Sequence, residues 1–300
     1  MTLDLEPRYL VTGATGELGR LVIAELLTRI PAARLVAGVR SQDHDVARTF
    51  RAKGVETRLA DYDTPESLRK AFSGIGRLLL ISAPAGPGRL QQHLSVIEAA
   101  KEAEVRLIAY TSLLHADRAT SGLGEDHRRT EAALRSSGLP HVLLRHGWYI
   151  ENHIPSVAPA LDYGAVIGCA GSGRFSSASR ADYAAADALV LTLDGQAGLI
   201  HELAGDDAYT LADLAEMISV ASHTSVAYRD MPREDFARAL IGMGLPAHVA
   251  DVIADSDVAA SLGEFENSSG HLRTLIGRPG TSSRSIISAA VSQAKTAAKG

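Results

Sequence analysis

The chain has 300 residues, enough for one large domain or for a large domain joined to a smaller one. Its 46% apolar and 22% charged residues are typical of a soluble globular protein, and its formal net charge of -5 argues against a general binder of nucleic acid or anionic membranes. The single Cys169 excludes an internal disulfide, residues 1–6 lack the basic start of a signal peptide, and no apolar run reaches the roughly 18 residues of a membrane span. We therefore expect a cytoplasmic protein without a membrane or nucleic-acid partner.

A glycine pattern near the start predicts a dinucleotide site. The apolar run Tyr9–Val11 leads into Gly13-Ala14-Thr15-Gly16-Glu17-Leu18-Gly19, and an apolar-periodic helix follows. Gly13 permits a tight turn, Gly16 lets the backbone approach phosphates, and Gly19 lets the helix pack close to the strand. The helix N-terminus offers N–H groups and a partial positive charge to a pyrophosphate. We expect Thr15, Glu17 and Leu18 to contribute to this turn, Thr15 and Leu18 through their backbone.

Short apolar runs alternate with helical patterns up to about Arg145, which indicates an α/β fold with a doubly wound parallel sheet of the Rossmann type. We predict strands at Tyr9–Val11, Leu35–Val39, Glu56–Ala60, Leu78–Ser82, Leu107–Thr111 and His141–Leu144, with helices such as Pro65–Phe72 and Leu90–Glu102 between them. In such a sheet the strand order reverses about the first strand. Ligands are therefore expected beyond the carboxyl ends of the first and fourth strands.

The pattern changes after Arg145, where Pro155 and Pro159 are expected to interrupt regular secondary structure. A buried helix is predicted over 181–193, a helix opened by capping chemistry at 210–213, and mostly helix over 230–264. Serine-pair loops flank 271–276, and the weakly amphipathic tail 285–300 is expected to fray. We predict a Rossmann domain over 1–152 and a smaller C-terminal α/β substrate domain over 153–300, with some segments returning to the first domain.

The end of the second strand indicates which dinucleotide is bound. An acidic residue there holds the ribose hydroxyls of NAD, whereas an arginine accommodates the 2′-phosphate of NADP. Here the strand Leu35–Val39 is followed by Arg40, whose guanidinium can bind a phosphate bidentately, and by no adjacent carboxylate. The alternative is a solvated arginine at the end of a strand. We favour NADPH.

The usual catalytic pair of a short-chain dehydrogenase is absent from the sequence. None of the eight tyrosines is followed four residues later by lysine, and no lysine occurs between Lys101 and Lys295. Reduction of an ordinary ketone would therefore lack its acid. A quinone is a strong electrophile whose reduction restores aromaticity, so its reduction needs placement more than acid catalysis, with water or a histidine completing protonation. The mixed aromatic and polar stretch after the sixth strand, residues 144–152, is suited to such a ring.

Longer motifs resemble the NmrA-like group of atypical short-chain dehydrogenases over nearly the whole chain, with quinone reductases and triphenylmethane reductases as the nearest members. The motifs are the glycine loop, Ala60-Asp61-Tyr62, Tyr110-Thr111-Ser112-Leu113-Leu114-His115-Ala116-Asp117, Gly147-Trp148-Tyr149 with Glu151-Asn152, Ala181-Asp182-Tyr183-Ala184-Ala185-Ala186 and Leu275-Ile276-Gly277. The resemblance implies NADPH bound by the glycine loop, by Arg40, by Ser82, Ala83 and Pro84, and by His146, Gly147, Trp148, Tyr149 and Glu151. It also implies a small quinone beside the nicotinamide, between the domains. His146 departs from the pattern, which has asparagine for an amide contact.

Ser112, Tyr149 and Asn152 are the candidate catalytic residues. Ser112 ends the fifth strand, where it either binds a substrate oxygen or closes a turn. Tyr149 and its neighbour Trp148 either line the quinone pocket or pack in the core. Asn152 and His153 are candidate donors to a quinone oxygen, and Arg180 is either a substrate contact or a solvated side chain.

These features favour an NADPH-dependent quinone oxidoreductase. Two alternatives stay open, a non-catalytic NADP(H) sensor of the NmrA-like kind and a reductase of dyes or nitro compounds. The histidines His115, His127 and His141 lack ligand spacing, so no metal is expected. The sequence is compatible with a homodimer.

Overall fold

The computed structural model describes residues 6–297 and contains a seven-stranded sheet in the order β3-β2-β1-β4-β5-β6-β8. Its strands are β1 (Tyr9–Val11), β2 (Leu35–Val39), β3 (Glu56–Leu59), β4 (Arg77–Leu80), β5 (Leu107–Leu113), β6 (His141–His146) and β8 (Ile200–Leu203). The pairs from β3 through β5 are parallel, and Leu10 lies opposite both Val36 and Leu78. Since the order reverses between β1 and β4, the predicted Rossmann-type fold is confirmed. Residues 1–5, on which the argument against a signal peptide rests, lie outside the described residues.

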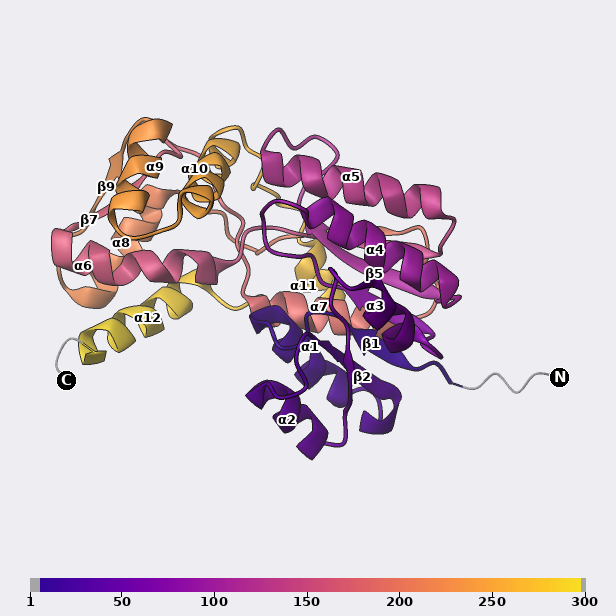
Figure 1. Cartoon of the computed structure of the whole chain (residues 1–300). Helices are drawn as coiled ribbons and strands as arrows, with labels where there is room; N and C mark the ends of the chain where they lie inside the picture. The colour runs from indigo at the N-terminus through magenta and orange to yellow at the C-terminus, as the bar shows by residue number, and fades with distance from the viewer. Residues whose placement is uncertain (1–5, 298–300) are drawn as a thin grey trace. The chain divides into compact units, whose positions relative to one another are not determined.

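Helices connect these strands: α1 (Glu17–Leu27), the 3-10 turn η1 (Ala32–Arg34), α2 (Asp45–Ala52), α3 (Pro65–Phe72), α4 (Arg89–Glu102) and α5 (Gly122–Ser137). Helices α3 and α4 lie side by side (Figure 1), and with α5 they bury apolar stripes that include Leu68, Val96 and Leu134 against one face of the sheet. The prediction of Pro65–Phe72 is confirmed at both ends, with Pro65 in the first turn, where its missing N–H breaks no helical bond.

Two strands end earlier than predicted, and after β4 side chains replace the sheet as hydrogen-bond partners. β3 stops at Leu59 instead of Ala60, and β4 stops at Leu80 instead of Ser82. Beyond Leu80 the backbone N–H of Ile81 donates to Thr12 Oγ1 at 3.1 Å, and that of Ser82 donates to Thr111 Oγ1 at 2.8 Å. The loop after β4 is thus held by side chains at the carboxyl end of the sheet.

The later part of the chain holds the 3-10 segment η2 (Ile150–Ser156), α6 (Val157–Tyr163), β7 (Ala165–Gly168), α7 (Arg180–Thr192), α8 (Leu211–Ser222), β9 (Ala227–Asp230), α9 (Arg233–Gly242), α10 (Ala247–Ser261), α11 (His271–Ile276) and α12 (Ser283–Ala297). β7 and β9 form a parallel pair. The predicted cap of α8 is confirmed as a capping box between Thr210 and Asp213, and α9 and α10 confirm the helical stretch 230–264.

Two expectations for this part were wrong. Pro155 and Pro159 do not interrupt the helical structure. Pro155 lies within η2, and Pro159 lies in the first turn of α6, where a proline is tolerated. The tail does not fray through Ala297, because α12 packs against α8 and α6; residues 298–300 lie outside the described residues.

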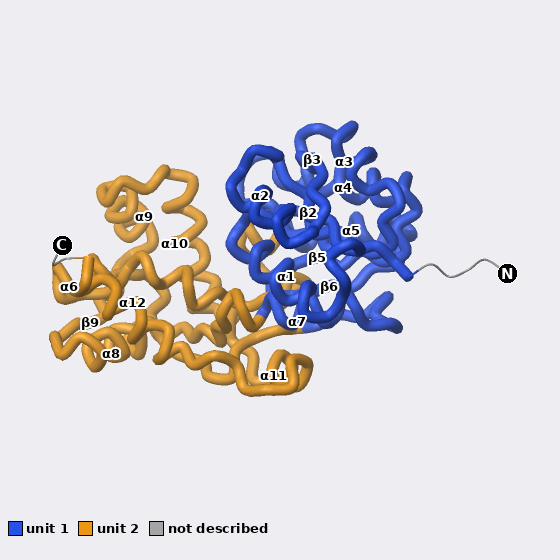
Figure 2. The backbone as a smooth tube through the Cα atoms, turned by 90° about the horizontal axis from the view of Figure 1, so that it is seen from below, with its two compact units in different colours: residues 1–113, 126–145, 183–201 blue, residues 114–125, 146–182, 202–300 orange. Residues whose placement is uncertain are grey.

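The chain divides into two compact units with interleaved segments (Figure 2): residues 1–113, 126–145 and 183–201, and residues 114–125, 146–182 and 202–300. Most of α7 belongs to the first unit, where Arg77 at the start of β4 donates to the carbonyls of Leu191 and Leu193 at 3.0 and 2.6 Å. The domains 1–152 and 153–300 stay a prediction, because compactness alone does not show which part binds which ligand. No helix within residues 6–297 is long and apolar enough to cross a membrane.

Candidate functional site

The turn between β1 and α1 has the backbone geometry of a phosphate cradle. Gly13 adopts φ +58°, and Gly16 is the N-cap of α1 without a side-chain cap from any described residue. A Cβ on Gly19 would lie 2.4 Å from the carbonyl oxygen of Gly13 and 2.7 Å from Cα of Ala14. A side chain at position 19 would therefore push α1 off the turn. The residues fit a dinucleotide pyrophosphate, which would receive the N–H groups of this uncapped helix end.

Arg40 follows β2 directly and is exposed. It makes no hydrogen bond or ion pair with any residue in 6–297, so its guanidinium is available to a ligand. It lies near Tyr62, where burial raises the pKa of the phenol while a Thr12 hydrogen bond and the Arg40 charge act in the opposite sense. The Tyr62 hydroxyl lies 2.5 Å from Thr12 Oγ1 and 2.7 Å from the carbonyl oxygen of Ile81. This tyrosine links the ends of β1 and β4 beneath the predicted cofactor crevice.

Ser112 lies near the end of β5 and is only 4% exposed. Its hydroxyl donates to Oε1 of Glu131 at 2.7 Å. Glu131 is fully buried and also accepts two hydrogen bonds from Arg145, at 2.8 and 2.7 Å. In the sequence Glu131 looks like one more acidic residue on a charged helix face, so nothing there indicated this role. In this structure the Ser112 hydroxyl donates its hydrogen bond to Glu131. The catalytic role of Ser112 stays a prediction.

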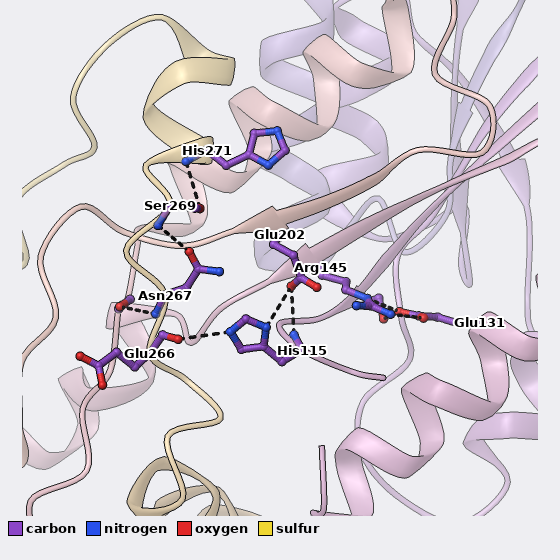
Figure 3. A network of polar contacts seen from close by, with 10 residues as sticks. His115, Glu131, Arg145, Glu202, Glu266, Asn267, Ser269 and His271 are labelled. Atoms are coloured by element: carbon purple, nitrogen blue, oxygen red, sulfur yellow. Dashed lines mark hydrogen bonds and ion pairs between the residues drawn. The ribbon is translucent and has the colours of Figure 1, made fainter. Parts of the chain in front are cut away.

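His115 takes the left-handed backbone conformation, with φ 54°, which is uncommon outside glycine and is frequent at functional sites. Its backbone N–H donates to Oε2 of Glu202 at 3.0 Å, and the same oxygen lies 3.7 Å from Nδ1 (Figure 3). Nε2 lies 3.2 Å from the carbonyl oxygen of Glu266. Glu202 therefore stabilises a strained turn, and no motif in the sequence marked it.

The segment after β6 gathers the polar residues predicted to meet the substrate. His146 Nδ1 lies 3.1 Å from the hydroxyl of Tyr149, and Arg180 stacks over the Tyr149 ring at 4.9 Å. Arg180 also donates to Oδ1 of Asn152 at 2.8 Å, and its backbone N–H donates to Glu151 at 2.9 Å. Arg180 is therefore a structural partner of this segment, a role that the sequence did not distinguish from a solvated side chain. Since Asn152 Oδ1 is occupied, its amide nitrogen is the group left to donate to a ligand.

An aromatic cluster lies behind this segment. Trp148 packs against Phe265 at 5.1 Å between ring centroids, and His153 packs edge-on against Phe175 at the same separation. Tyr209 stacks on Phe175. Burial lowers the pKa of His153 to about 4, so its imidazole is neutral near pH 7. Trp148 and His153 thus make ring contacts within this cluster, and their predicted roles toward the substrate stay predictions.

Residues 6–297 contain no group of three or more His, Cys, Asp or Glu side chains arranged to hold a metal ion. A parallel sheet reversing at β1 and β4, a three-glycine turn before α1 and an available arginine after β2 together define a Rossmann-type dinucleotide-binding protein.

Comparisons with known proteins identify the family of the chain. Residues 13–194 match a family model described as NAD(P)H-binding. The chain is 46% identical over 278 residues to quinone oxidoreductase 2 of Escherichia coli strain K12, covering 93% of this chain and 96% of that protein. The chain belongs to this NAD(P)H-binding family, in the group that contains the E. coli quinone oxidoreductase 2, and the resemblance drawn from the motifs is confirmed.

Two solved structures agree with this assignment. The crystal structure of the NADPH-dependent quinone oxidoreductase of E. coli complexed with NADPH matches with a TM-score of 0.91 at 46% identity, covering 94% of this chain and 99% of that one. The Citrobacter sp. triphenylmethane reductase complexed with NADP(H) matches with a TM-score of 0.88 at 35% identity, covering 95% and 99%.

Proposed function

We propose that the protein is an NADPH-dependent quinone oxidoreductase. The observation that carries this proposal is the uncapped three-glycine turn after β1 with Arg40 after the neighbouring strand β2, in a chain 46% identical to a quinone oxidoreductase over 93% of its length. The turn supplies backbone donors for the pyrophosphate, and Arg40 supplies a guanidinium for the 2′-phosphate. Bound NADPH would supply a hydride from the nicotinamide C4.

The reaction needs little acid catalysis from the protein. A quinone takes up one hydride and one proton to become a hydroquinone, so the electrons balance against oxidation of one NADPH. The chain's task is to place the ring and donate hydrogen bonds to its oxygens. We expect the amide nitrogen of Asn152 and the hydroxyl of Tyr149 to serve as these donors, and the last proton to come from water or a histidine. No lysine–tyrosine pair is required.

The predicted cofactor contacts of Ser82, Ala83 and Pro84, and of the segment 146–151, belong to the same proposal. The partner is a small quinone, the compartment that we expect is the cytoplasm, and a homodimer is compatible with the chain. Size-exclusion chromatography with light scattering tests the assembly directly.

A spectrophotometric assay tests the activity. Purified protein is mixed with NADPH and a simple water-soluble benzoquinone, and the absorbance of the reduced nicotinamide is followed. We expect one NADPH to be consumed for each quinone reduced, with NADH a poor substitute. Constant absorbance in the presence of protein that binds NADPH would overturn the enzymatic proposal and favour a sensor of NADP(H).

A triphenylmethane dye is the second substrate to test, because a triphenylmethane reductase is 35% identical to this chain over 95% of its length. The same assay follows bleaching of the dye. We expect a kcat/KM for the dye below that for the quinone; the reverse order would assign the enzyme to dye reduction.

A further inference from the structure

The loop after β4 is fixed by three successive backbone donors. The N–H groups of Ile81 and Ser82 donate to the hydroxyls of Thr12, directly after β1, and Thr111, in β5, and the N–H of Ala83 donates to Nε2 of His93 at 2.9 Å. Each acceptor comes from a different part of the fold. This loop lies at the carboxyl end of the strand where the sheet order reverses, which is the edge that receives the ligand in this fold.

Ala83 is held on both sides by the first turns of α4. Besides the His93 contact, its carbonyl oxygen accepts from Nε of Arg89 at 2.7 Å. His93 is fully buried and Arg89 is 2% exposed. Because side chains bind both backbone polar groups of Ala83, the peptide units on either side of it are each held by a buried hydrogen bond.

A second layer from α5 orients the two side chains. His93 Nδ1 lies 2.9 Å from Oγ1 of Thr130, which donates to the carbonyl of Asp126 at 2.9 Å. The proton of the neutral imidazole therefore sits on Nδ1, and Nε2 is free to accept from Ala83. Burial lowers the pKa of His93 to about 3, so this arrangement persists across the physiological range.

Arg89 is oriented in the same way. Its Nη2 lies 2.8 Å from Nε2 of His127, which must accept because a guanidinium only donates, and His127 Nδ1 lies 2.8 Å from the hydroxyl of Tyr110. Nη1 forms no hydrogen bond within the described part of the chain, and its nearest carboxylate, Asp126, is 3.8 Å away. Burying a charge so incompletely paired is costly, and an apolar core would hold α4 and α5 together equally well. The network therefore needs a reason other than stability.

We propose that His93 and Arg89 are positioning residues for the dinucleotide: they hold the loop Ile81–Pro84 in the conformation that receives the cofactor. This inference rests on the proposed function, because it takes the loop after β4 to contact NADPH. It assigns a role to side chains that do not touch the cofactor and that no motif in the sequence marked.

Variants of His93 separate positioning from stability. His93→Leu removes the acceptor for Ala83, and we expect NADPH to bind about tenfold more weakly, as for the loss of one buried hydrogen bond. The kcat for a benzoquinone at saturating NADPH should change by less than about twofold, because the reacting atoms are not touched. His93→Gln places an amide oxygen near the position of Nε2 and should restore most of the affinity.

Leu134→Ala is the matched control. Leu134 is fully buried on α5 in the neighbouring hydrophobic core and is not one of the residues that form the hydrogen-bond network around Ala83. It should lower the melting temperature without changing the NADPH affinity. If His93→Leu does not fold, Thr130→Val tests the same chain of hydrogen bonds and should weaken NADPH binding without abolishing it.

The outcomes distinguish this inference from the proposed function. Wild-type protein that fails to bind NADPH overturns both. Wild-type protein that reduces the quinone, together with a folded His93→Leu or Thr130→Val variant of unchanged NADPH affinity, overturns the positioning role alone. Affinity that merely follows melting temperature across all variants, Leu134→Ala included, also overturns it.

Discussion

The loop after β1 and the loop after β4 lie at the same edge of the sheet and are built in opposite ways. The first takes its shape from missing side chains: Gly13 adopts a left-handed conformation, and Gly19 lets α1 approach the turn. The second takes its shape from side chains that arrive from elsewhere, with His93 and Arg89 binding Ala83.

The difference lies in where the information for each shape is stored. Seven consecutive residues, 13–19, specify the first loop, so it can be recognised in a single sequence. The second depends on β1, β5, α4 and α5 being in place, so its own residues Ser82-Ala83-Pro84 carry little signal. A change in the first should act as a steric clash, whereas a change in the second should act as a lost hydrogen bond.

The largest effect should come from Gly19→Ala. The new methyl would lie 2.4 Å from a backbone oxygen, which cannot move aside as a flexible side chain would. We expect a loss of about 3 kcal/mol in the free energy of unfolding and no measurable NADPH binding by calorimetry. Gly242→Ala is the control, because a Cβ there meets no atom within 4 Å. If Gly19→Ala binds NADPH as tightly as the wild type, the turn between β1 and α1 is not the phosphate-binding site.

A smaller effect should come from substitution of Asp182, which lies about a hundred residues earlier in the chain and hydrogen-bonds the loop between α11 and α12. Burial by itself raises the pKa of this carboxyl, but hydrogen bonds from the Thr281 N–H, Ser179 and Arg278 outweigh it, so the pKa lies below its usual value. Asp182→Asn should lower the free energy of unfolding at neutral pH by about 2 kcal/mol.

The pH dependence of Asp182 follows from the sign of that shift. The folded pKa is depressed, so the stabilisation is fully present above the unfolded value near 3.9 and is lost as the pH falls through the folded value. Denaturant titrations at about pH 7 and about pH 3 should show the wild-type advantage over Asp182→Asn shrinking in acid. Exposed Glu234→Gln is the control, with little change at either pH. An advantage independent of pH would contradict the assigned cause.

Arg40→Ser should have an effect confined to one cofactor. Loss of the guanidinium should weaken NADPH binding about tenfold, or about 1.4 kcal/mol, and leave NADH unchanged, because only NADPH carries the 2′-phosphate. Fluorescence titration with both cofactors measures this. Arg29→Ser removes another exposed arginine and should affect neither. Equal weakening of NADPH and NADH would show that Arg40 does not read the 2′-phosphate.

Ser112→Ala should have the smallest effect. Its hydroxyl donates to Glu131, so we expect kcat for the quinone to fall by less than about threefold. Ser137→Ala, which removes a half-buried hydroxyl bonded to the Leu134 carbonyl, controls for a general loss of stability. A fall of about a hundredfold in steady-state kcat would show that Ser112 turns toward the substrate during the reaction.

The sequence predicted the first six strands and helices such as Pro65–Phe72 because their apolar periods are local. It did not predict β7, β8 or β9, and it ended β5 and β6 two residues too early. It placed the end of β4 at Ser82, two residues too late, because the residues after Leu80 remain compatible with a strand and only Thr12 and Thr111 remove them from the sheet. It also left Arg180 open, because its partners Tyr149 and Asn152 lie some thirty residues earlier in the chain.

The sequence by itself determined the Rossmann-type fold, the glycine cradle and the arginine after β2, since each depends on neighbouring residues whose conformational preferences act locally. Only the tertiary structure decided that Glu131 binds Ser112, that Glu202 holds His115 and that α4 fixes Ala83. A buried polar group needs a partner, and which partner it finds depends on how distant segments pack.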